Sequence, residues 1–144
     1  MPKEIVRELV YRAYEAYELG HRDFIVDLLD DDIELIFNGP SEVFPIPNRV
    51  RGRSAVLAAY KTIDETMELL SNKLEHVIVD GEHAAVIGER SMRLRASGRV
   101  INYKFAAFHL YRNGRLFKYQ SFVDTLDMAR QVLGLKVELP AYPR

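Results

Sequence analysis

Residues 84–124 read AAVIGERSMRLRASGRVINYKFAAFHLYRNGRLFKYQSFVD. Apolar and polar residues alternate through most of this stretch, which is typical of β-strands with one buried face. The alternation is interrupted at Ala96-Ser97-Gly98 and at Asn113-Gly114, whose residues favour tight turns. The pattern therefore predicts three long antiparallel strands, of which the second covers 100–112 and the third covers 116–123.

Arg90 is the one charged residue on an otherwise apolar face of the first of these strands. Side chains alternate between the two faces of a strand, so Arg90 shares its face with Val86, Gly88, Met92 and Leu94. A buried guanidinium needs a partner or a wet cavity, because removing its charge from water is costly. Arg90 is therefore the strongest indication of a functional pocket in this sequence.

The rest of the chain predicts helices and strands that would cover this sheet. The predicted elements are helices over 3–19, 22–29 and 54–70, strands over 33–38 and 73–79, and a short helix that begins at Asp124 and ends near Gly134. This order, with helices grouped against a largely antiparallel sheet, predicts an α+β domain. A curved antiparallel or mixed sheet wrapped around the three helices of the N-terminal half would form a cone with an apolar interior.

A long loop is predicted between Gly39 and Gly52. It contains three prolines but also Val43, Phe44 and Ile46, so it does not have the composition of a disordered linker. Ordered loops with apolar residues of their own are often binding loops or lids. An equally good interpretation is a loop that simply packs onto the core.

The composition argues against several classes of function. The 144 residues suit one domain, and 20 basic against 21 acidic residues give a net charge of −1, which indicates neither nucleic-acid binding nor an anionic membrane surface. No apolar run is long enough to span a bilayer. The chain has no cysteine and begins MPKEIVREL, without the apolar core of a signal peptide, so we expect a cytoplasmic protein.

Neither a metal nor a cofactor is expected. His21, His76 and His83 are scattered through the sequence without the spacing of metal ligands. No phosphate-binding loop, dinucleotide fingerprint or nucleophile-elbow motif occurs. The expected partner is instead a small hydrophobic molecule.

Three short motifs carry a resemblance to a known family. With the predicted order of elements, the motifs at residues 28–32 (LLDDD), 52–56 (GRSAV) and 121–124 (SFVD) resemble the NTF2-like superfamily, and more closely its SnoaL-like and ketosteroid-isomerase-related branch. The resemblance covers about residues 3–135 and implies one domain over residues 1–144. It also implies a pocket between sheet and helices, and a homodimer formed through the outer face of the sheet. Members include isomerases, cyclases, dehydratases, hydrolases and non-catalytic binding proteins, so the fold alone fixes no function.

The steroid isomerases of this branch use an aspartate as base and a protonated aspartic acid as hydrogen-bond donor. They are a well-known example of how a protein shifts the pKa of a carboxyl group. The resemblance would place the base at Phe37 or Asn38 and the acid at Ala107 or Phe108. None of these residues is an acid. The isomerase mechanism of that branch is therefore poorly supported.

The limonene-epoxide hydrolases resemble the chain more closely around Arg90. Their arginine matches Arg90 and their asparagine matches Asn38. Their two aspartates fall at Met92 and Ser121, and their tyrosine falls at Ile36. Water activation by that carboxylate network is therefore not expected, although the plan of the pocket can be shared.

Four residues are the candidate catalytic groups. Arg90 would polarise a carbonyl or bind a carboxylate, although a structural ion pair with Glu34 or Asp124 is an equal alternative. Asn38 would bind a substrate oxygen, unless it is only a turn residue at the end of a strand. Asp124 is the carboxylate nearest the expected rim, and its interpretation as a helix N-cap is favoured.

His109 is the fourth candidate, and its pKa would suit acid–base chemistry. A two-residue turn at Asn113-Gly114 pairs Phe108 with Tyr119, whereas a bulged turn shifts this pairing by one residue and reverses the face of every side chain. A position on the sheet surface or in a dimer interface is favoured for His109.

The predicted substrate-binding residues are mostly aromatic. They are Tyr14, Tyr17, Tyr60, Met92, Tyr103, Phe105 and Ser121. For Tyr14 and Tyr17, plain core packing is the favoured alternative, because buried tyrosine hydroxyls find many kinds of partner. Ser121 would also serve as a hydrogen-bonding partner of Arg90.

Three functions remain open on the sequence. The first is an enzyme that isomerises, cyclises, dehydrates or hydrolyses a hydrophobic, oxygen-bearing substrate. The second is a non-catalytic binder of a small apolar ligand, which the missing carboxylate base favours. The third is a dimeric interaction module that uses its sheet surface or the 39–52 loop.

Overall fold

The structure is a computed structural model that describes residues 3–136, 140 and 141. The predicted single domain over residues 1–144 therefore extends at both ends beyond the described residues. Within them, no helix is long and apolar enough to cross a membrane.

Four helices and six strands make up the described chain. They are α1 Lys3–Leu19, α2 Arg22–Leu28, β1 Leu29–Asn38, β2 Arg49–Arg51, α3 Arg53–Thr66, β3 Met67–Asp80, β4 His83–Leu94, β5 Val100–Arg112, β6 Arg115–Val123 and α4 Thr125–Leu133. The strands form one sheet in the order β2-β1-β6-β5-β4-β3, in which β1 and β6 are parallel and the other neighbours are antiparallel. The α+β class and the mixed sheet are confirmed.

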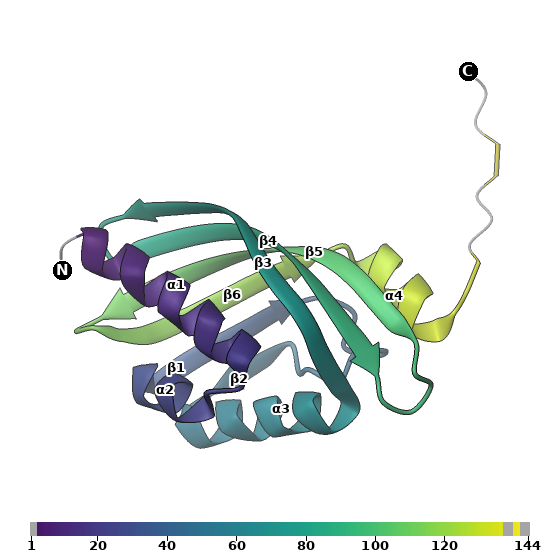
Figure 1. The fold of residues 1–144 in the computed structure, drawn as a ribbon, viewed down its shortest axis with the longest axis horizontal. Coiled ribbons are helices and arrows are strands. Elements are labelled where there is room, and N and C mark those ends of the chain that lie inside the picture. The colour runs from purple at the N-terminus through teal and green to yellow at the C-terminus, as the bar shows by residue number, and fades with distance from the viewer. Residues whose placement is uncertain (1–2, 137–139, 142–144) are drawn as a thin grey trace.

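The sheet bends around its helices. Figure 1 shows β3 to β6 curving past α1, while α2 and α3 lie along the lower side of the molecule beside β1. The short α4 follows β6 at the far end, where it packs on β5. The concave face of the sheet and the three N-terminal helices thus enclose the core, as the cone predicted from the sequence requires.

Strict alternation along β5 sets the inner face of the sheet. Ile101, Tyr103, Phe105, Ala107 and His109 are all buried, and the residues between them are partly or fully exposed. A β-bulge between Leu110 and Tyr111 then shifts the pairing with β6, so that His109 lies opposite Tyr119. The bulged alternative is therefore the one adopted, and the favoured surface position of His109 is wrong.

Several predicted boundaries are also wrong. The loop predicted from Gly39 to Gly52 contains β2, which pairs with β1. The helix predicted over 54–70 ends at Thr66, because Met67 already has extended backbone angles (φ −138°, ψ 148°) and starts the long strand β3. The strand predicted over 33–38 begins at Leu29, so Asp30, Asp31 and Asp32 lie inside β1. The three aspartates do end the preceding helix, but the chain enters the sheet directly.

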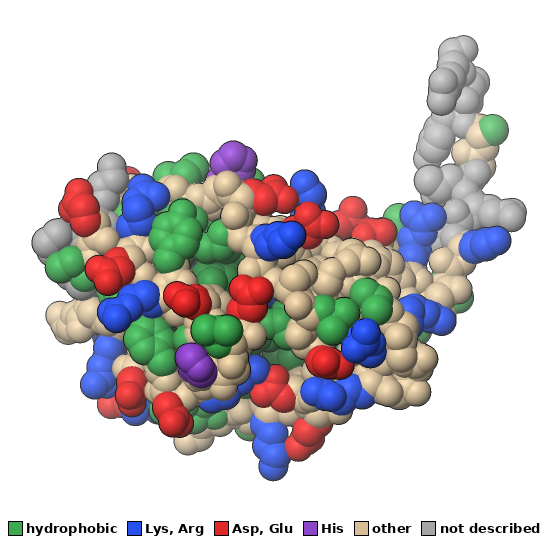
Figure 2. All heavy atoms as spheres, in the orientation of Figure 1, with side chains coloured by type: hydrophobic (Ala, Val, Ile, Leu, Met, Phe, Trp, Pro, Cys, Tyr) green, Lys and Arg blue, Asp and Glu red, His purple; other side chains and the backbone are tan. Residues whose placement is uncertain are grey.

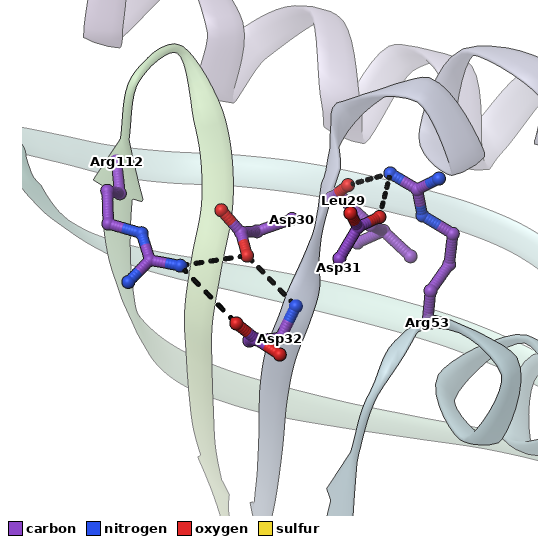
Figure 3. A network of polar contacts seen from close by, with 6 residues as sticks. All are labelled: Leu29, Asp30, Asp31, Asp32, Arg53 and Arg112. Atoms are coloured by element: carbon purple, nitrogen blue, oxygen red, sulfur yellow. Dashed lines mark hydrogen bonds and ion pairs between the residues drawn. The ribbon is translucent and has the colours of Figure 1, made fainter.

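The aspartates at the start of β1 are held by two arginines (Figure 3). Arg112 donates to Asp30 at 3.0 Å and lies 3.8 Å from Asp32, while Arg53 lies 3.3 Å from Asp31. The backbone N–H of Asp32 and the Arg112 guanidinium lower the pKa of Asp30, against an opposing effect of desolvation. These contacts tie β1 to the β5–β6 hairpin and to the start of α3.

Candidate functional site

A cavity of about 110 Å³ lies between the concave face of the sheet and the helices. Its wall takes side chains from α1, α2, α3, β1, β4, β5 and β6 and from the 39–52 loop, and most of the wall is apolar. On the helical side, Figure 2 shows green apolar side chains gathered over α1 between acidic and basic ones. The cavity thus lies behind a mixed, charged surface.

Nearly all the residues predicted for the site line this cavity. The ones that do are Arg90, His109, Tyr14, Tyr17, Tyr60, Met92, Tyr103, Phe105 and Ser121. They come from five separate elements, and the alternation of β4 and β5 brings their inward-facing members together. The apolar wall with a few polar groups has the composition of a small-molecule site.

Asn38 does not belong to the site, and its predicted catalytic role is corrected. Leu35 and Phe37 point into the cavity, so alternation along β1 turns Asn38 to the other face. There it is exposed and accepts a hydrogen bond from the Gln120 amide at 3.1 Å.

Asp124 is corrected in the same way. Its carboxylate accepts a hydrogen bond from the backbone N–H of Asp127 at 2.9 Å and caps α4. It is exposed and does not line the cavity. The favoured N-cap interpretation is confirmed: Asp124 lies between β6 and α4 and caps the first turn of α4.

Arg90 enters the cavity from β4 with aromatic rings around it. Its guanidinium carbon lies 4.4 Å from the centre of the Phe105 ring, 5.4 Å from that of Tyr17 and 6.0 Å from that of Tyr103. Gly88 allows the closest of these contacts, because a Cβ there would come within 2.6 Å of the Phe105 ring. Cation–π attraction accordingly replaces part of the lost hydration of Arg90.

The polar partner of Arg90 is an amide, not a carboxylate. Asn72 lies opposite Arg90 in the β3–β4 pairing, and its Oδ1 accepts a hydrogen bond from Arg90 Nε at 3.2 Å. Among the described residues no carboxylate pairs with Arg90, and the two suspected partners are used elsewhere. Glu34 pairs with Arg51 at 2.8 Å, and Asp124 caps α4.

Arg90 remains charged in this setting. Desolvation by burial acts to lower its pKa, and the neighbouring tyrosines, Tyr103 first, act in the opposite direction, so that the pKa is raised overall. Burial raises the pKa of Tyr14, Tyr17, Tyr60 and Tyr103, which keeps these phenols protonated at neutral pH.

His109 sits at the other polar position of the cavity, between two tyrosine hydroxyls. Its Nε2 lies 3.1 Å from the Tyr14 hydroxyl, and its Nδ1 lies 3.4 Å from the Tyr111 hydroxyl. Burial lowers the pKa of His109 to about 4, so the ring is neutral at pH 7. A neutral imidazole has one donor and one acceptor nitrogen, and each has a hydroxyl to meet.

The sequence did not identify Asn72 or Tyr119 as part of the site, whereas it predicted a binding loop as one of two interpretations of the apolar residues of the 39–52 loop. Tyr119 packs against the His109 ring at 5.0 Å between centroids, and Phe44 and Ile46 from the 39–52 loop form part of the wall. The loop therefore packs onto the core and lines the cavity at once. A bulged pairing of β5 with β6 would have predicted that Tyr119 faces the cavity. Asn72 could not be assigned to a face, because it lay between the helix predicted over 54–70 and the strand predicted over 73–79.

The cavity wall offers no carboxylate. Its polar side chains are phenols, one hydroxyl, one imidazole and one guanidinium. Over the described part of the chain, no group of three or more His, Cys, Asp or Glu residues could hold a metal ion. Any proton transfer by the wall would therefore involve His109 and the tyrosines.

Comparison with solved structures supports this description of the fold. A candidate isomerase from Rhodopseudomonas palustris is 24% identical, with a TM-score of 0.81 and coverage of 94% of this chain and 100% of that one. An NTF2-like protein from Burkholderia xenovorans LB400 is 22% identical, with a TM-score of 0.79 and coverage of 92% and 98%. TerC, co-crystallised with polyporic acid, is 14% identical, with a TM-score of 0.77 and coverage of 90% and 98%.

These identities show a shared fold and nothing finer. No curated protein matches the chain. The family model described as the SnoaL-like domain matches residues 10–119, which include α1, most of the sheet and the Arg90 and His109 sides of the cavity. The resemblance to the NTF2-like superfamily is confirmed, and the chain belongs to the SnoaL-like domain family.

Proposed function

We propose that the protein is an enzyme that moves a proton next to a carbonyl group of a hydrophobic substrate, in an isomerisation, cyclisation or dehydration. The observation that carries this proposal is the half-buried Arg90 side chain, whose guanidinium faces an apolar cavity without a carboxylate partner among the described residues. A charge in that setting is well placed to stabilise negative charge that develops on a substrate oxygen.

The Tyr14–His109 pair supplies the second half of the chemistry. Both side chains line the cavity and lie in hydrogen-bonding contact at 3.1 Å. His109 takes a proton from the substrate carbon, directly or through the Tyr14 hydroxyl, while Arg90 stabilises the enolate oxygen. Returning the proton to a second carbon completes an isomerisation. Loss of a β-hydroxyl group that takes the proton from His109 and leaves as water completes a dehydration, and attack of the enolate carbon on a second carbonyl group, whose oxygen then takes the proton, completes a cyclisation.

In this mechanism Arg90 must stabilise the enolate strongly. A base whose conjugate acid has a pKa of about 4 is weak, so it removes a carbon-bound proton only if the enolate is strongly stabilised. The positive charge of Arg90 supplies that stabilisation, and the apolar lining strengthens it, since charges interact more strongly away from water.

A non-catalytic binding protein is the second candidate. The observation that favours it is the cavity wall, which contains no carboxylate to act as a stronger base. In that case Arg90 and the tyrosines would hold a ligand that leaves unchanged. TerC, which has the same fold, was co-crystallised with polyporic acid, and a bound organic compound is compatible with both candidates.

We also propose that the protein forms a homodimer through the outer face of its sheet. Ile78, Ile87, Phe108 and Phe122 are exposed by 42% to 66%, and Ile87, Ala106 and Phe122 lie side by side across β4, β5 and β6. Exposed apolar side chains gathered in this way are typical of an interface. Sedimentation of wild type and Phe108→Lys tests the proposal: a dimer that the variant splits supports it, and a monomeric wild type contradicts it.

The test of the enzyme proposal is proton exchange. Cyclic and aromatic ketones with acidic α-hydrogens are incubated in D₂O with wild type and with Arg90→Gln, and deuterium uptake is followed by NMR. The proposal expects uptake in wild type and a loss of about 100-fold or more in Arg90→Gln, the size seen when one oxyanion donor is removed. Ketones that bind without any exchange would support the binding-protein candidate instead.

A further inference from the structure

Of the described residues that line the cavity, Arg90 is the only charged one. The tyrosines are protonated because burial raises their pKa, and the pKa of His109 is lowered to about 4, so neither kind of group offsets the arginine at pH 7. This wall therefore carries one net positive charge. A buried charge of this kind is stabilised most by an opposite charge brought in from outside.

Asn72 explains how the charge is held in place without being cancelled. The side chain is 5% exposed, and it stands behind Arg90 on β3, outside the cavity wall. Its Oδ1 accepts from Arg90 Nε at 3.2 Å, which fixes the orientation of the guanidinium. An aspartate of nearly the same shape would make the same hydrogen bond and would also neutralise the arginine.

The NH₂ group of the Asn72 amide does not explain why an asparagine occupies this position. Asn72 Nδ2 is buried and has no hydrogen-bond partner among the described residues. A buried donor left unpaired destabilises the fold, so an asparagine is not the residue that stability alone would favour here. What asparagine provides, and aspartate would not, is a neutral partner for Arg90.

The size of the cavity limits the ligand. At about 110 Å³ the space is smaller than a cavity of roughly 150 Å³ that holds a benzene molecule, so the enclosed part of the ligand is at most one ring. The wall around Arg90 consists of Phe105, Tyr17 and Tyr103, which suit an aromatic or alicyclic body.

We propose that the ligand of this cavity is an apolar monocarboxylate whose acid group binds Arg90, and that Asn72 is a positioning residue that orients the guanidinium while leaving its charge available. This inference rests on the binding-protein candidate of the proposed function and names the class of compound that it holds, because a guanidinium paired with an acid group is not available to an enolate oxygen. A carboxylate accepts two parallel hydrogen bonds from a guanidinium, a geometry that a neutral ketone cannot match.

The test compares an acid with its neutral amide. Dissociation constants of phenylacetate and phenylacetamide are measured by calorimetry on wild type, on Asn72→Asp, and on Asn113→Asp as the matched control. Asn113 is exposed in the β5–β6 turn, so its variant adds the same charge far from the cavity wall. Wild type and the control are expected to bind the acid at least about tenfold more tightly than the amide, as charge-assisted pairs do.

In Asn72→Asp the preference for the acid is expected to disappear, with at least a tenfold weaker affinity for phenylacetate and an affinity for phenylacetamide within about threefold of wild type. A purely structural role of Asn72 would weaken both compounds together. The wild-type preference alone already tests the charge, so the proposal stays testable even if Asn72→Asp does not fold.

Two outcomes would overturn the inference. If wild type binds the amide as tightly as the acid, or if Asn72→Asp keeps the preference, the charge does not select the ligand, while the proposed enzyme or binder of neutral compounds stands. If neither probe binds and no ketone undergoes exchange, the inference and the proposed function both fail.

Discussion

Arg90 and Arg112 lie on neighbouring strands of the same sheet but in opposite settings. Arg112 is on the surface, and it contacts Asp30 at 3.0 Å and Asp32 at 3.8 Å (Figure 3). Arg90 is inside, and its hydrogen-bond partner Asn72 is neutral. Charge is balanced by charge at the surface, whereas the cavity holds one charge that the described protein leaves unbalanced. The comparison separates a structural arginine from one that is available to a ligand.

The same contrast extends to the other groups of the two regions. His109 is held between the hydroxyls of Tyr14 and Tyr111, without a charged partner. Around β1, Arg53 joins Asp31 at 3.3 Å and donates to the Leu29 carbonyl at 2.6 Å. Variants in the cavity should therefore change binding and pH dependence, and variants at the surface network should change stability slightly.

The largest expected stability effect comes from His109. Its pKa is lowered to about 4 by burial, from about 6.5 in an unfolded chain, so its contribution is fully present above pH 6.5 and is lost as the pH falls towards 4. The free energy of unfolding should fall by about 3 kcal/mol across this window on account of His109.

Urea unfolding at pH 7 and pH 4.5 measures this effect in wild type, His109→Phe and the control His76→Gln, which changes an exposed histidine. His109→Phe should lose most of the pH dependence, and His76→Gln should keep it. An equal loss of unfolding free energy between pH 7 and pH 4.5 in all three proteins would show that His109 is not buried in its neutral form.

A smaller effect is expected at Gly88, which shapes the Arg90 side of the cavity. A Cβ at this position would lie 2.6 Å from the Phe105 ring and 2.7 Å from the Lys73 carbonyl oxygen, so Gly88→Ala must displace one of them. Overpacking of this kind costs about 1–3 kcal/mol, or roughly 3–10 °C in Tm. Differential scanning calorimetry checks this against Gly98→Ala, in which the added Cβ meets no neighbour and only the strain of a positive φ, absent at Gly88, can lower stability.

If Gly88→Ala loses no more stability than about 1 °C, the close packing of Phe105 on β4 is not as described. Ligand binding adds a second readout, because displacing Phe105 removes the ring nearest to Arg90 at 4.4 Å. Weaker binding of any cavity ligand is expected in this variant.

The smallest effect is expected for Arg112→Gln. Exposed ion pairs contribute little, because water screens them, so Tm should fall by less than roughly 4 °C, and binding to the cavity should not change. Thermal unfolding in low and high salt gives the measurement. A large loss of ligand binding in this variant would remove the distinction between the two arginines.

Much of this arrangement could be predicted from the sequence. The alternation around Arg90 identified its inward face correctly, because Val86, Gly88 and Met92 are buried beside it. The order of elements gave the fold class for the same reason: the apolar period separates helices from strands over long segments.

The rest depends on interactions that a local pattern does not contain. The face of Tyr119 follows from one bulge opposite Leu110 and Tyr111, which no residue in the turn specifies, whereas His109 keeps the unbroken alternation of β5. Asn72 escaped notice because β3 begins at Met67, inside a stretch with helical spacing. Asn38 was assigned inward by resemblance, although its neighbour Phe37 faces the cavity and excludes that orientation.

The most direct test of the account is a thermal-shift measurement on wild type and Arg90→Gln, using apolar carboxylates and ketones at saturating concentration. A ligand at 100 times its dissociation constant adds about 2.7 kcal/mol, which is roughly 6–10 °C for a chain of this size. The account predicts such a shift in wild type and its loss in Arg90→Gln, which should itself remain folded. Equal shifts in both proteins, or no shift with any compound in folded wild type, would contradict the claim that Arg90 is the centre of a ligand-binding cavity.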